Sequence, residues 1–345
     1  MIEEARGNLL QADVEALVNT VNCVGYMGRG IALQFRQAFP ANYEAYVKAC
    51  RAGEVQPGRV LVYETDALMG PRYIINVPTK RHWRGRSRYD DVEAGLSALA
   101  QVVRERGIRS VAVPPLGCGL GGLDWRRVRS MIQRAFAELP EVRVLLYTPS
   151  GTPEPQARPI HTPRPTMTRS NAVVIRLMEI YGRMDYRLTL LEVQKLAYFA
   201  QEAGEPLRLR YEQGPYGPYA DNLNQVLLAM ESHYTQGYTG GRKPDEEIAL
   251  VEGAADGAAA CLAKKRQTLQ RLDRVAALVD GFETPYGMEL LSSVHWVAKT
   301  PLKEQLTADD VVGRVHAWNT RKRRLLRQDH IHIAWEHLRA NGWIT

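Results

Sequence analysis

Six prolines fall within residues 148–170 of this 345-residue chain, and they restrict the possible folds more than any other feature. They are Pro149, Pro153, Pro155, Pro159, Pro163 and Pro165. Proline fixes φ and lacks an N–H, so a segment this rich in it suits neither a helix interior nor a central strand. We therefore expect an extended, semi-rigid linker at 151–170, between a first domain at 1–150 and a second at 171–345.

The first domain alternates short apolar runs with segments of helical spacing. Strands are expected near residues 1–5, 16–19, 60–63, 73–77, 111–113 and 142–147. Helices are expected at 31–39, 42–51 and 90–106, and after Asp124, whose side chain can cap the next one. This alternation predicts an α/β layer fold with a mainly parallel or mixed sheet.

The second domain has a mostly helical pattern. Apolar spacing predicts helices near 171–181, 189–203, 223–230, 254–280, 288–297, 309–319 and 329–340. Thr189 and Glu192 have the spacing of a capping box. Residues 214–219 predict a turn-rich hinge, and Arg321–Arg324 is interpreted as a solvated helix face in preference to a DNA contact.

The positive charge is concentrated before the second domain. The formal net charge is +7, with 20 Lys and Arg against 15 Asp and Glu in residues 1–150, and 22 of each in residues 171–345. A basic first half suits a nucleotide or DNA, although a solvated face would give the same count. The chain has four cysteines, no C-x-x-C pair, no membrane-length apolar run and no secretory signal, so we expect a cytoplasmic protein without a metal site.

Two glycine-rich loops each lie between a strand and a helix. The first carries Gly25, Gly28 and Gly30 before a helical pattern from Ile31, and the second spans residues 116–122. Free backbone N–H groups at such places bind anions, and glycine lets the backbone approach a ligand closely. Either loop alone could be an ordinary strand–helix turn, but together they predict two walls around one diphosphate.

Four segments of the first domain resemble a macrodomain, the ADP-ribose-binding module. They are Gly7-Asn8-Leu9-Leu10, residues 18–22, Gly28-Arg29-Gly30-Ile31 and residues 117–121. Among macrodomains the chain is similar to the terminal ADP-ribose glycohydrolase branch, and more narrowly to the DarG antitoxins. This resemblance implies a three-layer α/β/α fold with a mixed sheet. It also implies a hydrolase that releases ADP-ribose from thymidine bases of single-stranded DNA by cleaving the base–ADP-ribose N-glycosidic bond.

The resemblance assigns ADP-ribose, as ligand and product, to a set of positions, with no other cofactor and no metal. Asn8 would lie near the adenine, and the two glycine loops would hold the diphosphate. Cys118 is interpreted as a packing residue, because no histidine is placed to activate it. The ADP-ribose-binding positions are Gly7, Asn8, Leu9, Asn19, Thr20, Gly28, Arg29, Gly30, Ile31, Thr79, Pro115, Gly117, Cys118, Gly119, Leu120, Gly121 and Tyr147.

Lys80 and Asn22 are the catalytic residues that the resemblance implies, with Asn22 against the distal ribose. Lys80 lies in the segment 79–86, after the strand expected at 73–77. A neutral lysine can attack the anomeric carbon, whereas a protonated one can donate to the leaving base or stabilise its charge. Eukaryotic relatives resolve the lysine adduct with an aspartate, and this sequence has Gly121 at that position, so the covalent step stays open.

The segment after Lys80 predicts a contact with single-stranded DNA. His82 and Trp83 can stack on unpaired bases, and Arg84 and Arg86 can hold backbone phosphates. An exposed basic loop without a ligand would have the same composition.

The resemblance gives the second domain a different task, which is to bind and neutralise a DarT-like DNA ADP-ribosyltransferase toxin. The acidic residues Asp245, Glu246 and Glu247 are candidates for mimicking nucleic-acid phosphates in that contact. Two alternatives remain open for the whole chain: a reader that holds ADP-ribose without cleaving it, and a purely toxin-binding scaffold.

Overall fold

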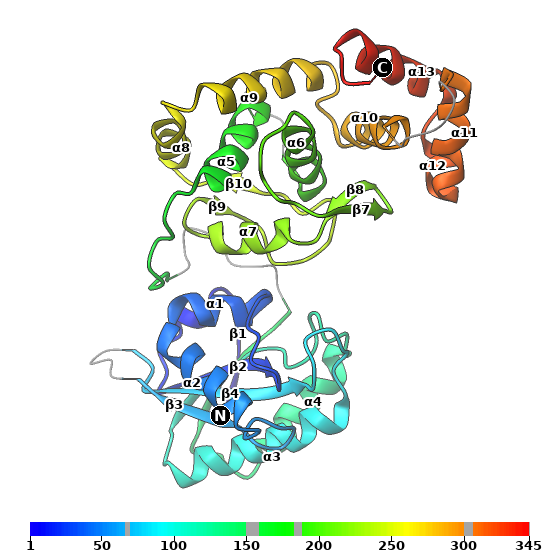
Figure 1. The fold of residues 1–345 in the computed structure, drawn as a ribbon. Coiled ribbons are helices and arrows are strands. Elements are labelled where there is room, and N and C mark those ends of the chain that lie inside the picture. Colours follow the sequence, from blue (N-terminus) through cyan, green and yellow to red (C-terminus); the bar gives the residue numbers. More distant parts are fainter. Residues whose placement is uncertain (66–69, 150–158, 183–187, 300–305, 345) are drawn as a thin grey trace. The chain divides into compact units, whose positions relative to one another are not determined.

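The computed structural model describes residues 1–65, 70–149, 159–182, 188–299 and 306–344. The chain forms two compact units, Met1–Pro163 and Arg164–Thr345, and each is described by itself (Figure 1). The division falls inside the range 151–170, over which the prolines predict a linker.

A six-stranded sheet of order β1-β6-β5-β2-β4-β3 forms the centre of the first unit. All neighbouring strands are parallel except β3 and β4, so the predicted mixed sheet is confirmed. The strands are β1 (Ile2–Ala5), β2 (Ala16–Asn22), β3 (Leu61–Glu64), β4 (Tyr73–Lys80), β5 (Ser110–Val113) and β6 (Arg143–Tyr147).

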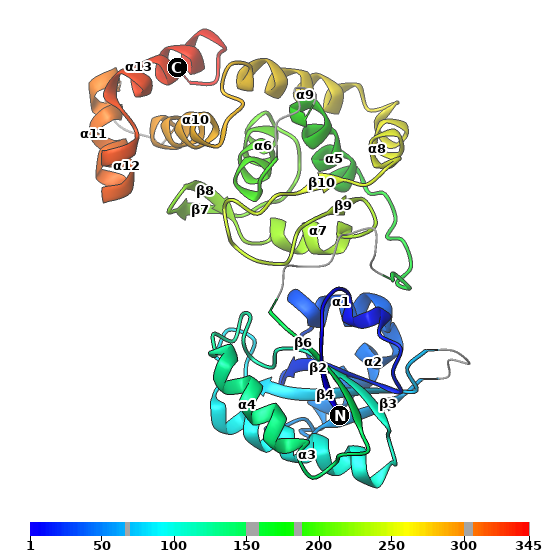
Figure 2. The same ribbon diagram turned by 180° about the vertical axis from the view of Figure 1, so that it is seen from behind.

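Helices cover both faces of this sheet, which confirms the three-layer α/β/α fold (Figures 1 and 2). Alternate strand residues point to opposite faces. Val18 therefore packs in the core under α3 and α4, whereas Leu17 packs with Phe35 of α1 on the other side. The helices are the 3-10 helix η1 (Leu9–Gln11), α1 (Gly30–Ala38), α2 (Pro40–Arg51), α3 (Tyr89–Glu105) and α4 (Trp125–Ala135).

Two strands of the first unit are longer than their sequence patterns predict. β2 continues past residue 19 and β4 past residue 77, because the two pair in parallel up to Asn22 opposite Lys80. A shift in register lies between Val21 and Asn22. Lys80 therefore ends β4, and the prediction that it follows this strand is wrong. The predicted cap of α4 is confirmed, because the Asp124 carboxylate accepts from the Arg127 N–H at 3.2 Å.

The second unit is mainly helical, with two short two-stranded sheets. Its described elements are α5 (Arg169–Gly182), α6 (Leu190–Glu202), β7 (Tyr211–Gly214), β8 (Gly217–Ala220), α7 (Leu223–Met230), β9 (Thr235–Gln236), β10 (Ala249–Leu250), α8 (Ala254–Leu262), α9 (Arg266–Val279), α10 (Pro285–Ala298), α11 (Ala308–Trp318), α12 (Thr320–Leu325) and α13 (Gln328–Ala340). The predicted capping box is confirmed, because the Thr189 N–H and hydroxyl both donate to Glu192 Oε2 at 2.7 Å. Among the described helices, none is long and apolar enough to cross a membrane.

Two predictions for the second unit are wrong, and a third is refined. The helical region expected at 254–280 is helical but consists of two helices, α8 and α9, separated at residues 263–265. Residues 214–219 belong to the hairpin β7–β8 and not to a hinge, because the strands pair across a turn at Pro215 and Tyr216. The basic run 321–324 lies in α12, but it is not wholly a solvated face, because Lys322 is fully buried. Its ammonium group donates to Glu289 and to the Ser293 hydroxyl, which compensates for the loss of water.

Candidate functional site

A cavity of about 520 Å³ opens where β2 and β4 end at their carboxyl termini. This is the edge of a parallel sheet at which α/β proteins usually bind their ligands. The cavity is lined by Gly7, Leu9, Thr20, Val21, Asn22, Tyr26, Gly28, Arg29, Gly30, Ile31, Ala32, Gln34, Thr79, Lys80, Trp83, Pro114, Pro115, Gly117, Gly119, Leu120, Gly121, Tyr147, Thr148 and Pro149.

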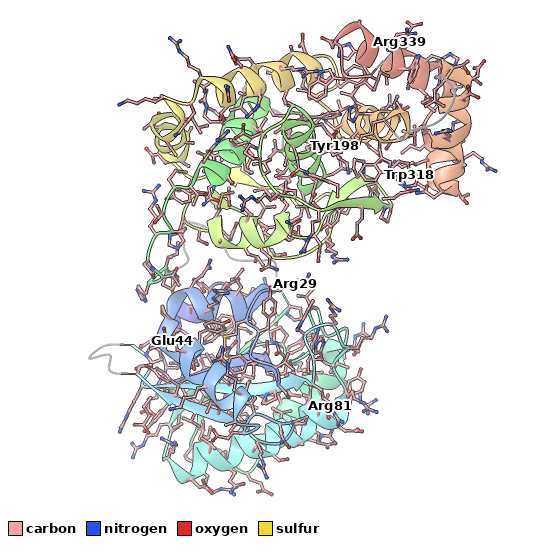
Figure 3. The ribbon with its side chains drawn as sticks, in the orientation of Figure 1. Arg29, Glu44, Arg81, Tyr198, Trp318 and Arg339 are labelled. Carbon is pink, nitrogen blue, oxygen red and sulfur yellow. The ribbon has the colours of Figure 1, made fainter. Side chains whose placement is uncertain are left out.

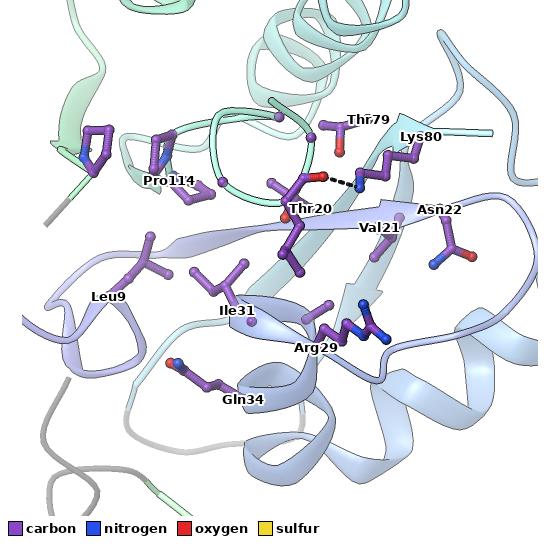
Figure 4. A pocket seen from close by; sticks show the side chains of 18 of the residues that line it. Leu9, Thr20, Val21, Asn22, Arg29, Ile31, Gln34, Thr79, Lys80 and Pro114 are labelled. Carbon is purple, nitrogen blue, oxygen red and sulfur yellow. Dashed lines mark hydrogen bonds between the residues drawn. The ribbon is translucent and has the colours of Figure 1, made fainter. Parts of the chain in front are cut away.

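The cavity has two chemically different ends (Figure 4). Leu9 and Ile31 lie toward one end, and Asn22 and Lys80 lie toward the other. Arg29 and Lys80 are the charged side chains of the lining, and no carboxylate of the described residues joins them. The arrangement suits an anion with an apolar group at one end and a polar, reactive group at the other.

The first glycine loop supplies a helix N-terminus to the cavity. α1 begins at Gly30, which has φ of +55°, and the preceding residues of the loop line the wall. A Cβ at position 28 would lie only 2.3 Å from the Tyr26 ring, so a larger residue here would force that ring to move. The first residues of α1, Gly30 and Ile31, line the cavity, so the helix N-terminus and its free N–H groups lie at the wall, as an anion site requires.

The second glycine loop is folded tightly against Ser87. The Ser87 N–H donates to Gly121 O at 3.1 Å, and a Cβ at position 121 would lie 2.2 Å from Gly117 O and 2.3 Å from Ser87 Oγ. This loop therefore has no room for a side chain at residue 121, where the eukaryotic relatives are expected to carry an aspartate.

Lys80 reaches across the cavity to this second loop. Its ammonium nitrogen donates to Leu120 O at 2.6 Å (Figure 4). Partial burial lowers the pKa of Lys80, and the Arg29 guanidinium lowers it further. Leu120 itself is 61% exposed, so the contact that orients the lysine lies at the mouth of the cavity.

Asn22 lines the same end of the cavity, but its amide also shapes the first loop. Nδ2 donates to Tyr26 O at 2.6 Å, and Oδ1 accepts from the Val24 N–H at 3.0 Å and from the Tyr46 hydroxyl at 3.1 Å. One Nδ2 hydrogen remains for a ligand. The strand register places Asn22 directly opposite Lys80.

Three of the residues expected to bind the ligand lie outside the lining. Asn19 is fully buried and donates to Asn76 Oδ1 at 2.9 Å, behind the cavity. Asn8 caps η1, because its side chain accepts from the Leu10 N–H. The Cys118 thiol turns back to Leu116 O, and burial raises its pKa to about 11, which suits a packing residue better than a nucleophile.

Of the four residues predicted to contact DNA, Trp83 lines the cavity and three lie beyond it. The His82 ring stacks on Trp83 with centroids 5.5 Å apart, and the Arg84 guanidinium lies 4.5 Å from the Trp83 ring centre. Tyr26 supports Trp83 from within the first loop, with the two centroids also 5.5 Å apart. His82, Arg84 and Arg86 are exposed, so an aromatic and basic surface leads into the cavity at Lys80.

Seven lining residues are not predicted from the sequence, namely Val21, Tyr26, Ala32, Gln34, Pro114, Thr148 and Pro149. Gln34 was detectable, because it lies four residues after Gly30 and so on the same face of α1. Thr148 and Pro149 follow β6, and only the sheet order brings that strand end beside the others. Elsewhere in the described chain, no group of three or more His, Cys, Asp or Glu residues is close enough to hold a metal ion.

Several known proteins are similar to this chain. Residues 18–132 match the family model of the Macro domain. The chain is 46% identical to a DNA ADP-ribosyl glycohydrolase of Thermus aquaticus, over 99% of this chain and 94% of the relative. It is 32% identical to a DNA ADP-ribosyl transferase–DNA ADP-ribosyl glycohydrolase fusion protein of Thermosipho africanus, over 41% of this chain and 40% of that protein. Among solved structures, the macrodomain of Mycobacterium tuberculosis DarG is 55% identical, covers 44% of this chain and 99% of its own, and has a TM-score of 0.43.

Proposed function

Because this chain belongs to the DNA ADP-ribosyl glycohydrolase family, we propose that it removes ADP-ribose from thymidine bases of single-stranded DNA. The first unit hydrolyses the N-glycosidic bond between the base and ADP-ribose. The second unit binds and neutralises the cognate DNA ADP-ribosyltransferase. The main support for the hydrolase activity is the position of Lys80. Its ammonium group donates to Leu120 O at the open end of the cavity, and the strand register places it opposite Asn22.

The two ends of the cavity support one orientation of ADP-ribose. The apolar end at Leu9 and Ile31 suits the adenine, and the N-terminus of α1 together with Arg29 suits the diphosphate. The distal ribose then lies at Asn22 and Lys80. A volume of about 520 Å³ is within the usual range for a nucleotide-sized ligand.

In the reaction we propose, Lys80 acts as the acid. The bond between the anomeric carbon and the thymine nitrogen breaks, and the Lys80 ammonium gives a proton to the departing base. Water then forms a bond to the anomeric carbon, and its proton passes to the neutral Lys80 amine, which restores the starting state. The lowered pKa of Lys80 favours the donation, because a weaker base gives up its proton more readily.

The alternative in which Lys80 attacks the anomeric carbon has less support. That route leaves an adduct for an acidic residue to resolve. The position of the resolving aspartate is Gly121, where a Cβ would collide with Gly117 O, and no carboxylate of the described residues lines the cavity. Asn22 has a positioning role in either route, because its amide sets the shape of the first loop and keeps one hydrogen for the distal ribose.

The DNA strand enters, in this proposal, over the surface formed by His82, Trp83, Arg84 and Arg86. Trp83 is the part of that surface that lines the cavity, so a base stacked on its ring would lie next to the anomeric carbon. The exposed arginines hold the neighbouring phosphates.

Neutralisation of the transferase is supported by the Thermosipho fusion protein, in which the two activities named for it are carried by one chain. Mimicry of phosphates by residues 245–247 has little support. The Glu246 carboxylate accepts from the Thr239 N–H within its own loop, which leaves Asp245 and Glu247 as the exposed acids.

The decisive experiment measures release of ADP-ribose from a thymidine-ADP-ribosylated oligonucleotide. Lys80→Ala should lower the turnover rate by roughly 10²- to 10⁴-fold, the range for loss of a general acid. Lys48→Ala is the matched control, because Lys48 is an exposed lysine of α2 outside the cavity lining. Unchanged turnover by Lys80→Ala would exclude this mechanism. Tight binding of ADP-ribose without turnover by the wild-type chain would identify a reader instead.

A further inference from the structure

The hairpin β7–β8 of the second unit has two very different edges. Helices α6 and α10 pack against β8, and side chains of α6 satisfy the outward backbone groups of that strand. Gln194 Nε2 donates to Ala220 O at 3.1 Å, and Gln194 Oε1 accepts from the Ala220 N–H at 3.0 Å. The Lys195 ammonium donates to Pro218 O at 2.7 Å. The edge of β8 is therefore closed by protein groups.

The opposite edge, formed by β7, is open. Gln213 pairs with Pro218, which has no N–H, so these two residues cannot form a mutually hydrogen-bonded pair. The hydrogen-bonded pairs are then Glu212 with Tyr219 and Gly214 with Gly217. The N–H and C=O groups of Tyr211 and Gln213 consequently point away from β8, and no described residue forms a hydrogen bond with any of them.

The open edge is held rigidly. Trp318 Nε1 donates to Gly214 O at 3.0 Å, and Asn319 Nδ2 donates to Pro215 O at 3.1 Å. The side chain of Trp318 is labelled in Figure 3. The Tyr211 hydroxyl donates to Gln194 O at 3.2 Å. An edge that is already ordered loses little conformational entropy when a partner binds to it.

A cavity of about 280 Å³ lies beside Gln213. Its lining is Gln213, Trp296, Val297, Arg314, Ala317 and Trp318. Two indole rings and an aliphatic side chain suit an apolar group about the size of one or two side chains. Arg314 adds a positive charge, which forms no salt bridge within the described part of the chain, although the Asp310 carboxylate one turn earlier on α11 interacts with it electrostatically.

From this juxtaposition we propose that β7 accepts an extended segment of the transferase as an additional strand. The segment pairs with the outward N–H and C=O groups of Tyr211 and Gln213. One of its apolar side chains enters the cavity between Trp296 and Trp318, and a neighbouring carboxylate pairs with Arg314. The inference rests on the proposed neutralising role of the second unit and adds the surface through which it acts.

The chemistry of the edge identifies the class of partner. Alternating backbone donors and acceptors along an extended strand are matched by another polypeptide strand, and pockets beside the edge select alternate side chains of such a segment. Nucleic acid has no backbone N–H groups with which to complete this pattern. A second copy of this chain, paired through its own β7, is the competing occupant.

The experiment measures binding of the full-length chain to the purified transferase by calorimetry. Gln213→Pro removes the outward N–H and leaves the ladder with β8 intact, because that N–H does not donate to β8. It should weaken binding at least tenfold. Gln213→Ala keeps the N–H and should bind more tightly than Gln213→Pro. Glu212→Ala is the matched control, because its side chain points to the other face of the hairpin.

A second arm tests the cavity without a change in the strand. Arg314→Glu reverses the charge and should weaken binding by roughly tenfold, and Ala317→Trp should fill the cavity and weaken it as well. Thermal melting and circular dichroism verify that each variant is folded.

The outcomes separate this inference from the function on which it rests. If the wild-type chain does not bind the transferase, both fail. If the wild-type chain binds the transferase, and the Gln213→Pro and Arg314→Glu variants bind it as tightly as the wild-type chain does, the toxin-binding role stands and the strand-addition surface is wrong. Light scattering that reveals a dimer lost in Gln213→Pro would assign the edge to a second copy of this chain and overturn the proposal.

Discussion

Each unit of this protein has a lysine whose pKa is lowered by burial, and the two lysines have opposite surroundings. Lys80 ends a strand at an open cavity and donates to a backbone carbonyl of an exposed loop. Lys195 is completely buried in α6, where burial and the nearby charge of Lys322 lower its pKa to about 7. Only the first lysine can meet a ligand.

The comparison shows that a lowered lysine pKa indicates burial and does not by itself indicate catalysis. Lys195 donates to Pro218 O and fixes the hairpin, while Lys322 is paired with Glu289 in the adjoining core. Lys80 has a weaker shift but faces a cavity lined by two glycine loops and a helix N-terminus. Perturbed groups point to function when they also lie in a cleft.

The largest effect expected in the second unit tests whether its buried charges are structural. Lys322→Met leaves the Glu289 carboxylate buried beside Arg321 alone and should destabilise the chain by about 3 kcal/mol. Urea denaturation followed by circular dichroism measures this, and turnover well below the midpoint should match that of the wild-type chain. Arg323→Met, an exposed residue of the same helix, is the control and should change stability by less than about 0.5 kcal/mol. If the two variants were equally stable, Lys322 would not be a structural residue, and the contrast with Lys80 would be wrong.

The pH dependence of turnover tests the role of Lys80 itself. Its pKa lies below the usual value of 10.5, so the proton-donating form is present at lower pH and is lost as the pH rises through the lowered pKa. If Lys80 is the acid, the rate constant of single turnover should be level below that pKa and fall about tenfold per pH unit above it. A rate that instead rises with pH toward that pKa would assign the neutral amine, and therefore the covalent route, to this enzyme.

A smaller effect is expected at the mouth of the cavity. Trp83→Ala removes the ring on which a base would stack and should lower kcat/KM for the oligonucleotide by about tenfold, corresponding to a loss of about 1.4 kcal/mol in stacking. Binding of free ADP-ribose, measured by calorimetry, should change less, since ADP-ribose carries no base beyond the distal ribose. Equal losses for both ligands would place Trp83 in the ADP-ribose site and not in the DNA contact.

Local patterns predicted the elements of both units well, because helix caps, apolar periodicity and glycine loops depend on neighbours in sequence. Asp124 and Thr189 cap their helices as expected. The ends of β2 and β4 were misjudged, since polar residues such as Asn22 and Lys80 continue a strand when the neighbouring strand supplies hydrogen bonds. The hairpin at 211–220 was missed for a similar reason, because glycine and proline usually indicate a turn without strands.

The candidate site was only partly predictable. The glycine loops and Lys80 line one cavity, whereas Asn19 packs behind it against Asn76. The direction of a side chain at the end of a strand depends on the register shift between Val21 and Asn22, which no local pattern encodes.

The sequence alone determined the alternation of strands and helices, the two glycine loops that can approach an anion, and the presence of a lysine near the end of the fourth strand. Only the tertiary structure decided which lysine faces a cavity. It pairs Asn22 with Lys80, brings Leu120 O to the Lys80 amine, and encloses Lys195 and Lys322 in a core. The physical reason is that burial, electrostatic pairing and access to ligand depend on groups far apart in the chain, such as residues 80 and 120 or 289 and 322.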